Sequence, residues 1–100
     1  MAQIIWTEPA LIQLDDTAEY IALDKPGAAG KLVRAVFKKV DRLERFPASG
    51  RVPPEFSSSV YREVVVPPCR IFYRLHENEV VILFVMHQEK QLRAYLLEST

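Results

Sequence analysis

The sequence predicts a single α+β domain, in which one short strand and two helices precede a three-stranded meander. Apolar residues recur at helical spacing through the first half of the chain, whereas the second half holds three β-branched runs separated by short breaks. The 100 residues fit one domain, which we assign to 1–100. We therefore expect an N-terminal strand and an antiparallel two-helix hairpin packed on one face of a three- to four-stranded, mainly antiparallel sheet.

The first half contains a strand and two helices in this prediction. Gln3–Trp6 is a strand, and Thr7 caps a helix that ends at the turn 24–27. The apolar stripe of this helix comprises Leu11, Leu14, Ala18, Ile21 and Ala22. A second helix is predicted for 28–46, because Pro47 stops it. Its buried face comprises Ala28, Leu32, Val36, Val40 and Leu43, widened by Val33 and Phe37.

Five cations of the second helix form a basic stripe, because they are spaced by three, four, four and three residues: Lys31, Arg34, Lys38, Arg42 and Arg45. One interpretation is a docking face for phosphate or for an acidic partner. The other is a solvated face that is partly paired with the acidic first helix. We favour the second interpretation, since exposed ion pairs are common and contribute little.

The second half is expected to begin with a loop over 48–59, in which Glu55 is interpreted as solvated surface and not as a general base. Strands are predicted for 60–66, Cys69–His76 and Glu79–His87, with breaks at Pro67-Pro68 and Glu77-Asn78. The third run is apolar at both parities, with Val80, Ile82, Phe84 and Met86 on one side and Val81, Leu83 and Val85 on the other. This pattern predicts a central strand.

Strand alternation places the polar residues of the sheet. Ile71, Tyr73 and Leu75 share the face that we expect the helices to cover. Arg70, Phe72 and Arg74 then line an open, concave face with His76, and Arg62 and His87 join it if the register allows. Such a face can hold phosphate and stack a base or a peptide group. Alternatively, the arginines pair with Glu63, Glu77, Glu79 or a C-terminal carboxylate.

Composition excludes several classes of protein. The formal net charge is zero and the pI is about 6.7, so no global basic field steers the chain to nucleic acid. The single cysteine, Cys69, rules out an internal disulfide and suits a reducing cytoplasm. The N-terminus does not resemble a signal peptide, and no apolar run is long enough to span a bilayer. We expect a cytoplasmic protein without a cofactor, a metal site or a membrane contact.

Three segments resemble the RelE/ParE toxin superfamily of bacterial toxin–antitoxin modules. They are TEPALIQLDDTAEYI at 7–21, YREVVV followed by CRIFYRL at 61–75, and VILFVMHQEKQLRAYL at 81–96. The resemblance covers nearly the whole chain in the order strand, helix hairpin, meander. It implies a stable complex with a cognate antitoxin, whose C-terminal segment wraps the toxin in a hetero-oligomer.

The superfamily divides by target. RelE-like members cut mRNA on the ribosome, and in that reading Arg70 and Arg74 hold phosphate while His87 supplies acid–base chemistry. The chain departs from this pattern. Valines occupy 64–66, the preceding loop has no lysine, and the late tyrosine position holds Leu92. A basic constellation for RNA cleavage is therefore incomplete.

ParE-like members inhibit DNA gyrase without nuclease chemistry. The ending His87-Gln88 followed by Arg93-Ala94 resembles ParE, so we predict a ParE-like toxin that is not an enzyme. The last strand and the tail are then expected to engage gyrase. Target-binding candidates are Arg62, Arg70, Arg74, His87, Lys90 and Arg93. The alternatives are a ribosome-dependent endoribonuclease and an inactive structural partner of an antitoxin.

Overall fold

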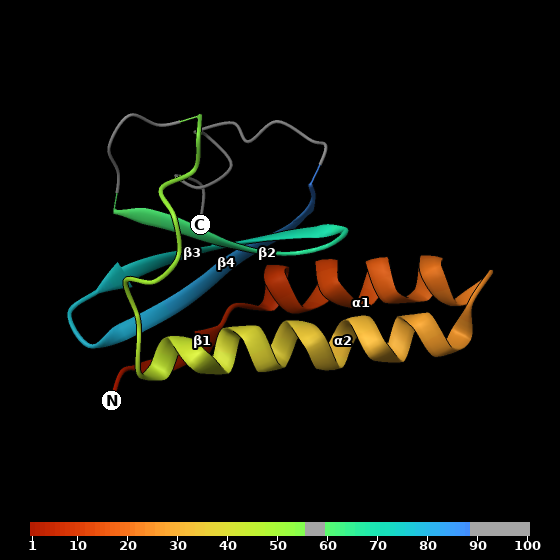
Figure 1. Ribbon diagram of the computed structural model, residues 1–100, viewed down its shortest axis with the longest axis horizontal. Helices are drawn as coiled ribbons and strands as arrows, with labels where there is room; N and C mark the ends of the chain where they lie inside the picture. Colours follow the sequence, from red (N-terminus) through yellow and green to blue (C-terminus); the bar gives the residue numbers. More distant parts are fainter. Residues whose placement is uncertain (56–59, 89–100) are drawn as a thin grey trace.

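The computed structural model describes residues 1–55 and 60–88 and has two layers, a helix hairpin and a sheet (Figure 1). The elements follow one another as β1 (Gln3–Trp6), α1 (Glu8–Ala22), α2 (Pro26–Asp41), the 3₁₀ turn η1 (Arg42–Glu44), β2 (Tyr61–Val66), β3 (Cys69–His76) and β4 (Glu79–His87). The predicted α+β class and the order of its elements are confirmed. Both helices lie on the same face of the sheet.

The sheet is mixed, with the strand order β1-β4-β3-β2. The strands β2, β3 and β4 form an antiparallel meander, because two short turns join them. The strand β1 runs parallel to β4, which the long connection through α1, α2, β2 and β3 permits. This arrangement places β4 between β1 and β3, as its two-sided apolar pattern predicts.

Thr7 joins the start of α1 to the sheet. Its Oγ1 accepts a hydrogen bond from the Ala10 N–H at 3.4 Å, which confirms the predicted N-cap, and donates to the Ile82 carbonyl at 2.7 Å. Ala10 and Leu14 are the buried residues of α1. The prediction that Leu11 belongs to the buried stripe is wrong, because α1 approaches the sheet through the small Ala10 and leaves Leu11 42 % exposed.

The helix α2 begins two residues before the predicted start and is shorter at its end. Pro26 opens the helix, where its fixed φ and missing N–H are tolerated. Regular α-helix ends at Asp41, and η1 continues the chain instead of helix to 46. Ala29, and not Ala28, belongs to the buried face. The rest of that face is confirmed as buried: Leu32, Val36, Val40 and Leu43.

A bulge in β4 changes which residues face the helices. Phe72 pairs with Phe84, whereas Tyr73 pairs with Ile82, so Leu83 is the extra residue. Val80, Ile82 and then Val85 pack in the helix-side core, while other apolar residues pack on the opposite face: Val81, Leu83, Phe84 and Met86. The predicted strict alternation is therefore wrong beyond Ile82.

The helix α1 also covers the part of β4 that β1 does not reach. Pairing with β1 ends at Ile82, which leaves the outer edge of β4 without a strand partner. At one position Gln13 of α1 takes the place of a strand partner, because its Oε1 accepts a hydrogen bond from the Val85 N–H at 2.7 Å. A buried amide that would otherwise cost free energy is thus paired.

The main core lies between the helices and the sheet. Ile71 and Tyr73 are fully buried there, which confirms that the helices cover their face of β3. Val36 and Val40 meet them from α2, and each fully buried aliphatic side chain stabilises the fold by about 1.5–3 kcal/mol. Within the described residues no helix is both long and apolar enough to cross a membrane.

Candidate functional site

The face of the sheet opposite the helices carries the predicted arginines. Arg70, Phe72 and Arg74 share this face, as alternation along β3 requires, and Phe72 packs with Leu83 in a second small apolar cluster. The expectation that the face is open at Arg70 and Phe72 is wrong, since their exposed fractions are 5 % and 0 %. The chemistry of this face therefore depends on what Arg70 contacts.

Arg70 donates hydrogen bonds to two carboxylates. Its Nε lies 2.7 Å from Glu63 Oε1, and its Nη1 and Nη2 each lie 2.8 Å from a Glu55 carboxylate oxygen. Nη2 also lies 3.2 Å from Glu63 Oε2. All three guanidinium nitrogens are therefore engaged by carboxylates, in the forked geometry that favours arginine over lysine.

The surroundings of Arg70 compensate its burial. Hydrogen bonding to Glu55 raises the pKa of Arg70, with a further contribution from Glu63 against the opposing effect of burial. The guanidinium also lies 4.8 Å from the centre of the Phe72 ring, and Arg51 Nε donates to Glu63 Oε2 at 2.9 Å. The result is a network of two arginines and two glutamates on one face of the sheet.

Glu55 corrects one prediction from the sequence. We interpreted it as a solvated loop residue, but its carboxylate is largely buried, with 15 % exposure, and pairs with Arg70. The expected pairing of sheet arginines with Glu63 is confirmed for Arg70. Arg70 thus links Glu55, in the loop before β2, to Glu63 of the sheet.

Arg74 is the arginine of this face that retains hydrogen-bonding capacity. It is half-buried and pairs across the sheet with Tyr61 of β2 and Val81 of β4. Its Nε is buried, and no residue described by the structure accepts a hydrogen bond from it. The side chain as a whole is only half-buried, so the guanidinium remains a cation with which an incoming carboxylate or phosphate can pair.

Arg62 lies on the other face of the sheet, because it pairs with Tyr73 in the antiparallel register. Its Nη1 donates to the Gly50 carbonyl at 2.9 Å. The prediction that Arg62 joins the patch of Arg70 is therefore wrong for this register. It stabilises the loop before β2 from the helix side.

Tyr73 also holds this loop against the sheet, through two hydrogen bonds of its hydroxyl. Its hydroxyl donates to the Pro47 carbonyl at 2.7 Å and accepts from the Gly50 N–H at 3.0 Å. Burial raises the pKa of Tyr73, with opposing effects from the Gly50 N–H and Arg62. The loop therefore contacts the sheet on both of its faces, through Tyr73 and Arg62 on one and through Glu55 on the other.

His87 lies apart from the arginines. It pairs with Cys69, whose side chain belongs to the helix-side core, and lines a shallow hollow with Gln13, Asp16 and Thr17 of α1. The predicted nuclease set of Arg70, Arg74 and His87 is thus not assembled on one face. Lys90 and Arg93, the other predicted target-binding residues, lie outside the described residues.

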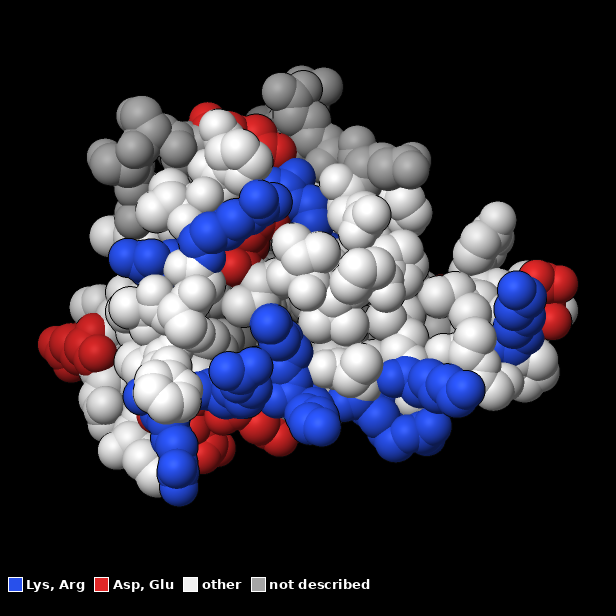
Figure 2. All heavy atoms as spheres, in the orientation of Figure 1, with Lys and Arg blue, Asp and Glu red and all other residues white. Residues whose placement is uncertain are grey.

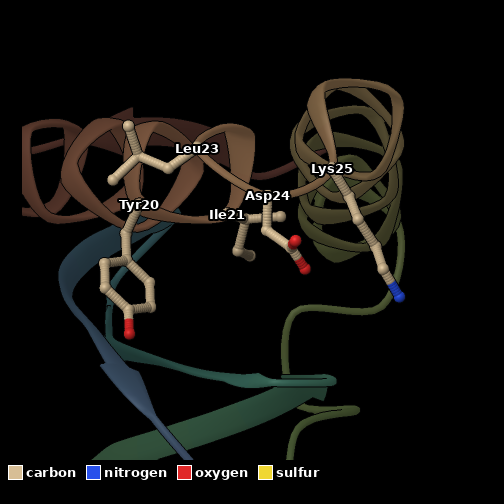
Figure 3. Close-up of a pocket in the computed structure, with 5 residues that line it drawn as sticks. All are labelled: Tyr20, Ile21, Leu23, Asp24 and Lys25. Carbon is tan, nitrogen blue, oxygen red and sulfur yellow. The ribbon is translucent and has the colours of Figure 1, made fainter.

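An open hollow lies at the tip of the helix hairpin, lined by Tyr20, Ile21, Leu23, Asp24 and Lys25 (Figure 3). Tyr20 and Leu23 are 77 % and 86 % exposed, so the hollow offers apolar surface and few converging polar groups. A small-molecule site usually has several converging polar groups, so this composition does not indicate one.

Metal and thiol chemistry have little support in the described ranges. The carboxylates of Asp15, Asp16 and Glu19 lie within 4.8 Å of one another, but all three residues are exposed on α1. The buried Cys69 has its pKa raised by desolvation, which keeps its thiol protonated and unreactive.

The sequence contained one signal for the Arg70 network. In a hairpin centred on Pro67-Pro68, Arg70 is opposite Val65, which places Glu63 diagonally beside it on the same face. The contribution of Glu55 has no such signal, because its position depends on the path of an irregular loop. The unmatched Nε of Arg74 likewise emerges only from packing.

Comparisons with known proteins agree with this architecture. A family model described as the ParE toxin of the type II toxin–antitoxin system parDE matches residues 4–92. The protein Y4kP of Sinorhizobium fredii, named as a candidate toxin, is 42 % identical over 91 residues, covering 89 % of this chain and 91 % of its own. Toxin RelE2 of Caulobacter vibrioides is 34 % identical over 88 residues, covering 87 % and 96 %.

A solved structure has the same fold. The chromosomal ParDE toxin–antitoxin system from P. aeruginosa superposes with a TM-score of 0.75, covering 89 % of this chain and 98 % of that one, at 23 % sequence identity. At this identity the likeness concerns the fold alone.

Proposed function

Because this chain belongs to the ParE toxin family of type II toxin–antitoxin systems, we propose that it inhibits DNA gyrase by binding it and does not cut RNA. Membership of this family implies an antitoxin partner. The choice between the two targets known in the superfamily is the part that we propose.

The engagement of Arg70 is the observation that carries this proposal. Metal-independent cleavage of RNA needs a cation free to hold the scissile phosphate, with a base and an acid nearby. All three nitrogens of Arg70 donate to Glu55 and Glu63 instead. His87 pairs with Cys69, on the opposite face from Arg70. This arrangement supports a toxin that acts through surface contact.

Two surfaces are available for that contact in this proposal. Arg74 is half-buried on the sheet face and makes no ion pair within the described residues, so its positive charge can pair with an acidic group of gyrase. The end of β4 and the tail that follows it form the other surface, as the resemblance to ParE implies. His87 lies at the end of β4, and we propose that Lys90 and Arg93 of the tail, which lies outside the described residues, take part in the same contact.

Purified full-length toxin and gyrase test the proposal directly. We expect the toxin to block supercoiling of relaxed plasmid, and expression of the toxin in cells to cause filamentation with a DNA damage response. Addition of antitoxin restores supercoiling. Rapid translation arrest with cleaved mRNA, while supercoiling continues, would overturn the proposal in favour of the endoribonuclease.

Two variants separate the two surfaces. Truncation after residue 89 is expected to abolish inhibition of gyrase and to leave antitoxin binding largely intact. Arg74→Gln is expected to weaken inhibition, whereas Lys25→Gln at the exposed helix-hairpin tip serves as its matched control and leaves inhibition unchanged. Full inhibition by the truncated chain would show that the tail is not a contact.

A further inference from the structure

We propose that the basic stripe on α2 and η1 binds the phosphodiester backbone of duplex nucleic acid. Its five members are Lys31, Arg34, Lys38, Arg42 and Arg45, and all of them are exposed. In Figure 2 Lys and Arg side chains run along α2 at the lower edge of the molecule. This surface is distinct from the sheet face and the β4 end, and the inference does not depend on the target of the toxin.

The stripe lacks the partners that an ordinary solvated face would have. We favoured partial pairing with the acidic α1, yet no ion pair within 4.0 Å joins a stripe residue to any carboxylate in the described ranges 1–55 and 60–88. The acidic residues Asp15, Asp16 and Glu19 gather on α1 instead. The segment 26–45 carries six cations and two acids, Asp41 and Glu44, so a chain of zero net charge has a local excess of positive charge here.

The helix bears an electrostatic cost for this arrangement. Arg34, Lys38 and Arg42 follow one another at intervals of four residues, and like charges at that spacing repel. Lys38 is favoured near the C-terminus of α2, but Lys31 lies in the first half, where the helix dipole disfavours a cation. A polyanion that neutralises the stripe removes this repulsion.

The dimensions and composition of the stripe favour duplex backbone over other polyanions. The 14 residue steps from Lys31 to Arg45 span about 21 Å, a length over which duplex DNA presents roughly a dozen phosphate charges. Binding of single strands relies on aromatic platforms, but the aromatic residue within this span, Phe37, packs on Trp6 with ring centroids 4.9 Å apart. The stripe therefore offers charge without a stacking surface.

Salt dependence of binding tests this proposal with defined probes. The full-length toxin, freed of antitoxin, is titrated into a fluorescent 30-bp DNA duplex, an RNA duplex of the same sequence and a single strand. Five phosphate contacts predict a slope of about −4.5 in log K against log salt, or a roughly 500-fold loss between 50 and 200 mM salt. The two duplex arms distinguish DNA from RNA as the source of the backbone.

Paired single substitutions locate the contact. Lys38→Gln is expected to make the slope shallower by about one. Lys25→Gln removes the same charge outside the stripe and is expected to leave the slope unchanged. Circular dichroism and a urea midpoint confirm that both variants fold, which exposed positions tolerate.

Three results would overturn the proposal. These are no duplex binding at 50 mM salt, equal effects of Lys38→Gln and Lys25→Gln, and tighter binding to the single strand than to either duplex. If Lys38→Gln weakens the antitoxin complex while duplex binding is undetectable, the stripe recognises an acidic protein segment instead. Gyrase inhibition is measured separately, so failure here does not affect the proposed function.

Discussion

Arg70 and the basic stripe carry the same kind of charge in opposite environments. Arg70 is 5 % exposed and donates to Glu55 and Glu63, whereas the stripe residues are exposed and, within the part of the chain that the structure describes, make no ion pair. The cation that most resembled a catalytic group is thus buried and paired with carboxylates. The cations that most resembled solvated surface are the ones that remain available to bind a partner.

The difference teaches that a cation can bind a partner only if carboxylates of its own chain do not already engage it. Removing a buried paired charge leaves its partners uncompensated, while removing an exposed unpaired charge leaves nothing behind. The two regions should therefore respond to substitution with different magnitudes and, for the stripe, with the opposite sign.

The largest effect is expected for Arg70→Met. This change leaves the carboxylates of Glu55 and Glu63 close together without their cation, and we expect a loss of about 3–5 kcal/mol in the free energy of unfolding. Urea denaturation of the full-length toxin measures it. Arg34→Met in the basic stripe is the control, with an expected change within about 0.5 kcal/mol. Equal losses for both variants would refute the distinction between the two regions.

Gly50→Ala is expected to be the next largest. A Cβ at Gly50 would lie 2.5 Å from the Tyr73 hydroxyl oxygen and 2.7 Å from the Glu63 carbonyl, so the loop would have to move away from the sheet. We expect a loss of about 1–3 kcal/mol by overpacking. Thermal unfolding gives the measurement.

Gly27→Ala provides a control of opposite sign. A Cβ at Gly27 meets nothing within 4 Å, and alanine is the better helix former by about 1 kcal/mol. Its melting temperature should therefore rise. A fall for both glycine variants would show that loop contacts do not explain the effect at Gly50.

Tyr73→Phe tests the fastening of the loop on the helix side and predicts a pH dependence. Loss of the hydroxyl costs about 1–2 kcal/mol at neutral pH, because the Gly50 N–H and the Pro47 carbonyl lose their partner. Burial raises the pKa of Tyr73 above its ordinary value of 10.0, so the folded state holds the phenolic proton more tightly than the unfolded chain.

The sign of the pH effect follows from this shift. The contribution of Tyr73 to stability is complete below about pH 10 and is lost as the pH rises from there through the folded pKa. Unfolding free energies measured from pH 8 to 11 should converge for the wild type and Tyr73→Phe. Cys69, whose pKa is also raised, is present in both proteins and cancels in the difference. A constant gap across this range would contradict the buried phenol.

The smallest effect, again a gain in stability, is expected for Arg34→Glu. This substitution replaces two repulsions on the helix surface by attractions to Lys31 and Lys38, and each such pair contributes about 0.2–0.5 kcal/mol. Stability should rise at low salt, and the gain should shrink at 1 M salt. A loss of stability would show that Arg34 already has a favourable partner.

Local patterns were sufficient for much of the fold. Thr7 with Pro9 predicted the start of α1, and the spacing of Leu32, Val36 and Val40 predicted the buried face of α2, because these signals lie within a few turns of chain. The bulge at Leu83 could not be predicted, since it depends on how β4 pairs with β3. It reversed the expected faces beyond Ile82.

The candidate site was predicted in part. The shared face of Arg70, Phe72 and Arg74 follows from alternation along one strand, and the pairing with Glu63 follows from the hairpin register. The burial of Arg70 and the placement of Arg62 on the other face require knowledge of the loop and of strand pairing. Residues far apart in the chain decide both.

The sequence by itself determined which residues are cations, which strand and helix carry them, and which family the chain resembles. Only the tertiary structure decided which cations are free. Glu55 reaches Arg70 across 15 positions of chain through an irregular loop, and no periodicity specifies such a contact. Within the described residues the basic stripe makes no ion pair, while the carboxylates of Asp15, Asp16 and Glu19 on α1 lie close to one another. Spacing along one helix does not specify which charges of two packed helices meet, so only the tertiary structure could show this.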